Sequence, residues 1–153
     1  MKRILNFLKK LFQISSILNG KTVNVIIDVS GSINISWRKL FYSYVKLLLR
    51  VGKHVNLVLV DNFIQKTYHL KNVSDLSLIS IDVGQAGDGV QKGLDYIALH
   101  NLSMNNTVLF TDGYTYPSLS LDAVPGKLLI LNTLKESPIK SDYKNVKQKI
   151  IKL

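Results

Sequence analysis

The sequence of 153 residues contains no cysteine. The chain therefore forms neither disulfide bonds nor thiolate zinc sites, and it has no cysteine nucleophile. The lack of cysteine is consistent with a reducing compartment. A chain of this length buries about 70% of the surface of its extended form, so it needs no covalent or metal cross-link to fold. Its length accommodates one domain of ordinary size and excludes a second.

Acidic residues are scarce. Ten Asp and Glu residues stand against twenty Lys and Arg residues, which gives a formal net charge of +10. Such a charge attracts nucleic acids, anionic membranes and acidic proteins without specificity. Only three of the basic residues are arginine, the side chain that makes bidentate contacts with phosphate and guanine. The charge therefore leaves a nucleic acid or an anionic membrane as alternative partners and identifies neither.

Long hydrophobic runs are also missing, because no stretch reaches the ~18 apolar residues that a membrane span needs. Lys9 and Lys10 interrupt the first apolar segment, so residues 1–20 do not resemble a signal peptide. We therefore expect a cytoplasmic protein, or one of the host-cell cytoplasm if a phage encodes it. Residues 1–20 are predicted to form a basic amphipathic helix that packs on the domain's own sheet or lies on an anionic membrane surface.

Between residues 21 and 153, short apolar runs alternate with amphipathic segments, which is typical of a single α/β domain with a mainly parallel sheet. The apolar runs are short and rich in β-branched residues, as buried parallel strands are. We predict such strands at residues 23–28, 55–60, 107–111 and 128–131. Apolar and polar side chains alternate along residues 64–70, which are predicted to form a solvent-facing edge strand.

Apolar side chains at helical spacing predict three helices in the same region. The first has Ser36 as its N-cap and stops at Gly52. The second covers residues 90–100, with its inward side chains at Leu94, Ile97 and Ala98. A closing helix is predicted in the tail that follows Pro138, where the helical spacing is carried by Tyr143, Val146, Ile150 and Ile151.

Polar side chains follow the predicted strands at the edge where open α/β sheets bind ligands. One group stands directly after the first strand, one in a glycine-rich loop before a helix, and one after the strand at residues 107–111. Convergent carboxylates and hydroxyls favour a hard cation such as Mg²⁺, Ca²⁺ or Mn²⁺. The predicted metal-site residues are Asp28, Ser30, Ser32, Asp88 and Asp112.

The pattern Asp28-x-Ser30-x-Ser32 after a hydrophobic strand resembles the metal-ion-dependent adhesion motif of von Willebrand factor A-like domains. The turn Thr111-Asp112-Gly113 resembles the later aspartate motif of that family, in the right order and at a suitable separation. The surrounding residues are most similar to the compact bacterial and phage branch, and the resemblance covers about residues 23–131. It implies a three-layer α/β/α fold with a mainly parallel, Rossmann-like central sheet.

The resemblance also implies a function. In this family, the hydroxyls of Ser30 and Ser32 would bind the metal directly, and Asp28 and Asp112 would hold its water ligands. The open position of the metal, most simply Mg²⁺ with Mn²⁺ or Ca²⁺ as alternatives, would accept a carboxylate from a protein partner. The domain would then be a docking module and not an enzyme. Tyr114 and Tyr116 are candidates for partner-facing anchors, because tyrosine is enriched in protein interfaces.

The middle loop departs from the family pattern, which places a threonine hydroxyl there. One alignment puts Asp88 at the threonine position, which adds a third carboxylate that would tighten cation binding and repel an acidic partner. A shift of one residue leaves Gly87 at that position and makes Asp88 the aspartate that follows it, with one ligand fewer. The branch also tends to carry an aspartate after the second strand. Asp61 stands there and is interpreted as a turn residue beside the site.

Other chemistries have weaker support in the sequence. The glycine-rich loop lacks a Walker lysine, and there is no nucleophile-elbow motif. The three histidines stand far apart in different predicted elements, without acidic neighbours at ligand spacing. Three alternatives stay open: a structural or assembly protein, for example of a phage; a basic nucleic-acid or membrane-surface binder with a vestigial metal site; and, with less support, a metal-dependent hydrolase that uses the same carboxylates.

Overall fold

The computed structural model describes residues 9, 13, 18, 20–33, 35–80, 84, 89–100, 102, 106–112, 128–132 and 146–150. The strands in these residues are β1 (Thr22–Asp28), β2 (His54–Val60), β3 (Ile64–Leu70), β4 (Thr107–Thr111), β5 (Leu128–Asn132) and β6 (Val146–Ile150). The helices are α2 (Ile35–Arg50), the 3₁₀-helix η1 (Val73–Leu78) and α3 (Val90–Leu99).

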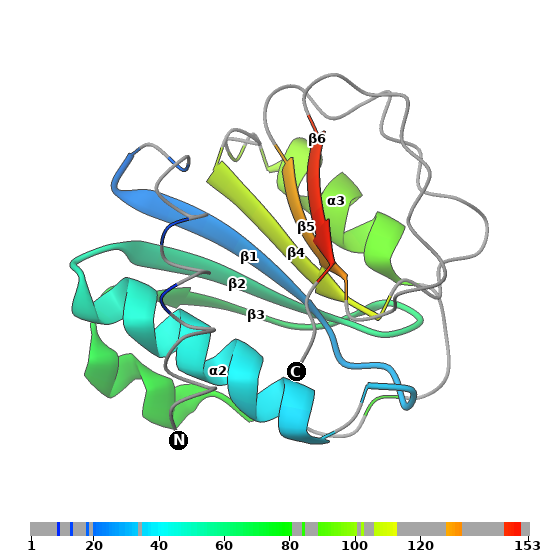
Figure 1. Cartoon of the computed structure of the whole chain (residues 1–153), viewed down its shortest axis with the longest axis horizontal. Helices are drawn as coiled ribbons and strands as arrows, with labels where there is room; N and C mark the ends of the chain where they lie inside the picture. The colour runs from blue at the N-terminus through cyan, green and yellow to red at the C-terminus, as the bar shows by residue number, and fades with distance from the viewer. Residues whose placement is uncertain are drawn as a thin grey trace.

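The strands form one sheet in the order β3-β2-β1-β4-β5-β6 (Figure 1). Neighbouring strands are parallel except for β3, which runs antiparallel to β2. The predicted α/β class, the mainly parallel sheet and the strand at residues 64–70 are therefore confirmed. The chain runs outward from β1 to β2 and returns to pair β4 on the other side, so the strand order reverses between β1 and β4. Open α/β sheets bind ligands at such a reversal, outside the carboxyl ends of the strands.

The alternation of side chains along β1 explains how the helices are distributed. Val25 and Ile27 point to one face and belong to the core cluster that contains most of the buried residues of α2. Ile26 points to the other face and packs with the buried residues of α3. Because β1 is apolar on both sides, it can lie in the centre of the sheet with a helix on each face. Gly93 of α3 lies so close to β1 that a Cβ atom there would stand 2.8 Å from Cγ2 of Ile26.

The predicted closing helix is wrong for the residues that the structure describes in the tail. Residues 146–150 form β6, which pairs in parallel with β5 from Val146 to Ile150. A separation of four residues places two side chains on one face of a helix and equally on one face of a strand. The spacing of Val146 and Ile150 was therefore compatible with both structures, and the pairing with β5 decides between them.

Helix ends were predicted to within a few residues. The helix α2 begins at Ile35, so Ser36 lies inside it and is not its N-cap. Gly52 has a φ of 79°, which confirms the predicted stop, since glycine adopts this conformation with little strain. On α3, Leu94 and Ile97 are buried as predicted, but Ala98 is exposed and Gly93 faces the sheet instead.

Most of the predicted helix at residues 1–20 lies outside the described residues. Within it, Lys9 and Gln13 are exposed, and Leu18 is buried in the core cluster on the α2 side of the sheet. Among the described helices, none combines the length and the apolar composition that crossing a membrane requires.

Candidate metal centre

The carboxyl ends of β1 and β4 lie side by side and carry the polar residues that the sequence singled out. The register pairs Ile27 with Phe110, so that Asp28 stands beside Thr111. The Thr111 hydroxyl donates a hydrogen bond of 3.0 Å to Oδ2 of Asp28. Asp112 directly follows Thr111, and its charge raises the pKa of Asp28. The structure thus brings together the polar group that follows the first predicted strand and the one that follows the strand at residues 107–111, which are more than eighty residues apart in sequence.

The loop that follows β1 presents two hydroxyls. The backbone N–H of Ser30 donates a hydrogen bond of 2.9 Å to Oδ1 of Asp28, which bends the chain back over the end of the strand. The Oγ atoms of Ser30 and Ser32 are 3.0 Å apart. Two neighbouring ligands of an octahedral Mg²⁺, each bound at 2.0–2.1 Å, are about 2.9 Å apart. The two hydroxyls therefore have the separation that Mg²⁺ requires, and they could exchange their mutual hydrogen bond for the ion.

The carboxylates of this site are poorly hydrated. Asp28 is 3% exposed and Asp112 is 6% exposed. Burial raises the pKa of Asp28 above its ordinary value of 3.8; hydrogen bonds from Ser30 lower it, the charge of Asp112 raises it again, and the Thr111 hydroxyl lowers it. The upward effects prevail, so the charged form of Asp28 is disfavoured in the folded protein. A bound divalent cation would offset both the lost hydration and the repulsion between the two carboxylates.

The raised pKa of Asp28 has a defined effect on stability. The folded, cation-free protein binds the Asp28 proton more tightly than the unfolded chain does, so the contribution of Asp28 to stability becomes less favourable as pH rises from 3.8 through the raised pKa. We expect the side-chain carboxyl ¹³C signal of Asp28 to titrate above 3.8 in EDTA. Asp75 is an internal control, because backbone hydrogen bonds from Lys71 and Asn72 lower its pKa. A midpoint of Asp28 at or below that of Asp75 would contradict the expectation.

Two glycines hold the ends of the middle loop against this site. The N–H of Gly84 donates a hydrogen bond of 3.0 Å to the Val29 carbonyl. A Cβ atom on Gly84 would lie 2.8 Å from Cβ of Asp61, and one on Gly89 would lie 2.0 Å from the Asp61 carbonyl oxygen. Both ends of the loop therefore lie beside the carboxyl ends of β1 and β2. Asp88 itself lies outside the described residues, and its two alternative alignments stay predictions. Tyr114 and Tyr116 lie outside them as well.

Asp61 acts as a turn residue, as predicted. It is fully buried at the end of β2, and its carboxylate accepts hydrogen bonds from the Phe63 N–H at 3.2 Å and from Nε2 of Gln65 at 2.6 Å. These bonds fix the turn between β2 and β3. Because Gly84 and Gly89 pack on Asp61, the same turn also supports the middle loop.

The sequence interpretation missed Arg38. This residue is 8% exposed, and its Nη2 atom donates to the Ser30 carbonyl at 3.2 Å and to the Val29 carbonyl at 3.5 Å. It thereby fastens the loop that follows β1 to the first turn of α2. A signal was present in the sequence, because Arg38 precedes the buried residues Phe41 and Val45 by three and seven positions, which places it on the inward face of the helix.

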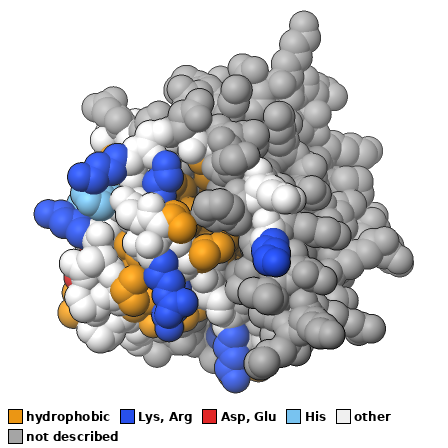
Figure 2. Space-filling model, turned by 60° about the vertical axis from the view of Figure 1, so that its left-hand side comes forward, with side chains coloured by type: hydrophobic (Ala, Val, Ile, Leu, Met, Phe, Trp, Pro, Cys, Tyr) orange, Lys and Arg blue, Asp and Glu red, His pale blue; other side chains and the backbone are white. Residues whose placement is uncertain are grey.

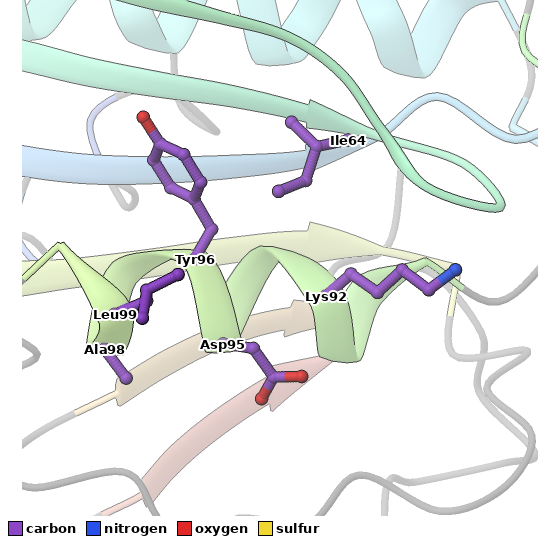
Figure 3. A pocket seen from close by; sticks show the side chains of 6 residues that line it. All are labelled: Ile64, Lys92, Asp95, Tyr96, Ala98 and Leu99. Atoms are coloured by element: carbon purple, nitrogen blue, oxygen red, sulfur yellow. The ribbon is translucent and has the colours of Figure 1, made fainter.

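The described surface also contains a shallow hollow of about 600 Å³ along α3. Tyr96 and Ile64 lie on the same side of the helix there, whereas Asp95 extends to the other side (Figure 3). The hollow is lined by Ile64, Lys92, Asp95, Tyr96, Ala98 and Leu99. With one carboxylate and one ammonium group among mainly apolar side chains, it does not provide the oxygen ligands that a divalent cation needs.

Across the described part of the chain, no three Asp, Glu or His side chains approach closely enough to hold a metal ion. The candidate centre consists there of the carboxylates of Asp28 and Asp112 and the hydroxyls of Ser30 and Ser32. In comparisons with known proteins, no family model matches this chain, and no curated protein matches it significantly. A function must therefore be inferred from the arrangement of these side chains.

Proposed function

We propose that this chain is a divalent-cation-dependent protein-binding module with a three-layer von Willebrand A-like fold. The observation that carries the proposal is the convergence of the Ser30 and Ser32 hydroxyls with the buried carboxylates of Asp28 and Asp112 at the reversal of strand order between β1 and β4. This position and this set of oxygen ligands are suited to Mg²⁺.

The four side chains have different roles in the proposed centre. Ser30 and Ser32 bind the ion through their hydroxyls, since their separation fits two adjacent ligands. Asp28 and Asp112 hold water ligands by hydrogen bonds and supply the negative charge that the hydroxyls lack. The bonds from Arg38 to the carbonyls of Val29 and Ser30 keep the loop in place while the ion is exchanged.

Two observations favour a protein partner over a chemical reaction. Phe63 and Ile35 are 53% and 68% exposed, and they stand in the β2–β3 turn and at the start of α2, at the same edge of the sheet as the centre. Aromatic side chains such as that of Phe63 are enriched in protein interfaces relative to the rest of the surface. The three histidines, all described, stand elsewhere: His54 begins β2, His69 pairs with Asn56 and His100 follows α3. A hydrolase built here would lack a histidine base.

Cation binding tests the proposal directly. We expect calorimetric titration of the EDTA-stripped protein with Mg²⁺, Mn²⁺ or Ca²⁺ to show one site, and we expect Ser30→Ala combined with Ser32→Ala to weaken its affinity at least about tenfold, because two ion ligands are lost. Ser43→Ala is the matched control, since the Ser43 hydroxyl donates only within α2 to the Lys39 carbonyl in the contacts described here. If no cation binds, or if the double variant Ser30→Ala/Ser32→Ala binds cations as tightly as the wild type does, the centre is vestigial and the proposal fails.

A further inference from the structure

Acidic and basic side chains lie at opposite ends of the strands of the sheet. The buried acids Asp28, Asp61 and Asp112 stand at the carboxyl ends of β1, β2 and β4. At the opposite end, a group of basic side chains surrounds the start of β1, the start of β2 and the end of β3. This group is defined as the histidine–lysine edge and comprises Lys21, Lys53, His54, His69 and Lys71.

Contacts within the histidine–lysine edge are direct. Thr22 pairs with His54, and the His54 N–H donates a hydrogen bond of 2.8 Å to the Lys21 carbonyl. The rings of His54 and His69 are 6.3 Å apart and nearly perpendicular. The Lys53 ammonium bonds to the Gly20 carbonyl, which holds it at the same corner. In Figure 2, lysine or arginine side chains gather beside a histidine on this part of the surface.

The basic groups repel one another. Desolvation, and then the charges of Lys21, His69 and Lys71, lower the pKa of His54 below 6.5. Asp75 is the acidic residue that acts on this group, and its carboxylate accepts the backbone N–H groups of Lys71 and Asn72. Among the residues that the structure describes, one acid against three lysines leaves an excess of positive charge, which a bound anion would relieve.

We propose that the histidine–lysine edge binds the phosphate backbone of single-stranded nucleic acid. Lysines that surround two imidazole rings combine charge for phosphates with flat faces on which unpaired bases stack. The ring of His69 is held in place, since its Nδ1 contacts Oδ1 of Asn56, whose Nδ2 donates to Oδ1 of Asn24 at 2.9 Å. An anionic membrane would use the charge of the lysines only, whereas unpaired bases would also use the faces of the two imidazole rings, which favours a nucleic acid. The site is separate from the metal centre and does not depend on it.

His54 makes the binding depend on pH in a predictable direction. A bound phosphate favours the protonated form of His54 and offsets the repulsion from Lys21, His69 and Lys71. Affinity therefore increases as pH falls from 8 to 6, because protonation adds positive charge to the site. Protonation of His54 adds one positive charge to those of the three lysines of the edge.

The test is fluorescence anisotropy with a labelled oligothymidylate of twenty nucleotides, at pH 6 and pH 8 and over 50–300 mM NaCl. We expect Lys21→Glu with Lys53→Glu and Lys71→Glu to weaken binding at least about tenfold and to reduce the slope of log K against log salt by about 2, as three lost phosphate contacts would. The matched control replaces Lys39, Lys66 and Lys92 by Glu, which changes the net charge equally at exposed positions of α2, β3 and α3.

The outcomes separate this site from a diffuse charge effect. An equal loss in both triple variants, or unchanged binding in the first, would overturn the proposal. So would binding to vesicles with 30% phosphatidylserine at concentrations where the oligonucleotide does not bind, since the partner would then be a membrane. Circular dichroism of both variants confirms that a loss of binding is not a loss of fold. If His54→Ala leaves the pH dependence unchanged, His54 does not take part in binding and the assignment of this edge fails.

Discussion

Asp28→Asn is expected to make the cation-free protein more stable at neutral pH and to abolish its stabilisation by divalent cations. The two effects have opposite signs and one cause. The Asp28 carboxylate is buried, and its raised pKa means that its charge destabilises the fold when no cation is present. Asparagine removes this charge while keeping a side-chain oxygen that can accept the hydrogen bond from the Ser30 N–H.

The expected size of the cation effect follows from mass action. A cation at a hundredfold excess over its dissociation constant stabilises the folded state by about 2.7 kcal/mol. For a domain of this length, that corresponds to a rise of about 5–10 °C in melting temperature. We expect this rise in the wild type and none in Asp28→Asn, because in the proposed centre the charge of Asp28 holds the water ligands of the ion.

Thermal unfolding in EDTA and in millimolar Mg²⁺, Mn²⁺ or Ca²⁺ measures both effects. Asp95→Asn is the matched control, since Asp95 is an exposed carboxylate on α3 that accepts a hydrogen bond from Gln91. It should keep the full response to cations. A variant Asp28→Asn that is less stable than the wild type in EDTA would show that the hydrogen bonds of the carboxylate outweigh its desolvation. A variant that keeps the cation response would remove Asp28 from the site.

Gly89→Ala is expected to destabilise the fold by at least about 3 kcal/mol, at or above the upper end for overpacked positions. The Cβ atom of alanine would lie 2.0 Å from the carbonyl oxygen of Asp61 and 2.7 Å from its carbonyl carbon. These are backbone atoms of the turn between β2 and β3, and no side chain can rotate to relieve the contact. The start of α3 or the turn would have to move, and the support of the middle loop would move with it.

Two other glycines supply a graded comparison. A Cβ atom on Gly93 would lie 2.8 Å from Cγ2 of Ile26, a side-chain atom that can shift, and alanine is favoured over glycine within a helix by about 1 kcal/mol. We therefore expect Gly93→Ala to change stability by less than about 1 kcal/mol. A Cβ atom on Gly31 would have the Gly84 oxygen as its nearest neighbour, at 3.6 Å, which is an ordinary contact. Gly31→Ala should change stability by less than about 0.5 kcal/mol.

Urea unfolding of the three variants in EDTA measures this order, and the yield of soluble protein serves where Gly89→Ala does not fold. A Gly89→Ala variant as stable as Gly31→Ala would mean that α3 does not approach Asp61 as closely as described. Gly31 lies between Ser30 and Ser32, so its substitution could change cation binding as well as stability. EDTA removes the cations, so the measured stabilities of the three variants do not include cation binding.

The sequence by itself was sufficient for much of the central sheet, and it predicted Asp28 and Asp112 at the edge where the structure brings them together. The strands at residues 22–28, 54–60 and 107–111 are short apolar runs that end in polar residues, and this pattern is local. Because the carboxyl ends of parallel strands meet at one edge, Asp28 and Asp112 could be expected to lie together before their positions were known. The resemblance to von Willebrand A-like domains, the helix at residues 1–20 and the role of Asp88 stay predictions.

Only the tertiary structure decided the features that depend on distant parts of the chain. The spacing of Val146 and Ile150 suits a helix or a strand, and pairing with β5 selects the strand. Nothing near Gly89 in sequence indicates that the Asp61 backbone excludes a side chain there. The raised pKa of Asp28 likewise arises from burial and from Asp112, which directly follows a strand far along the chain. Periodicity reports which face of an element is apolar, whereas close approach and burial depend on the elements that pack against it.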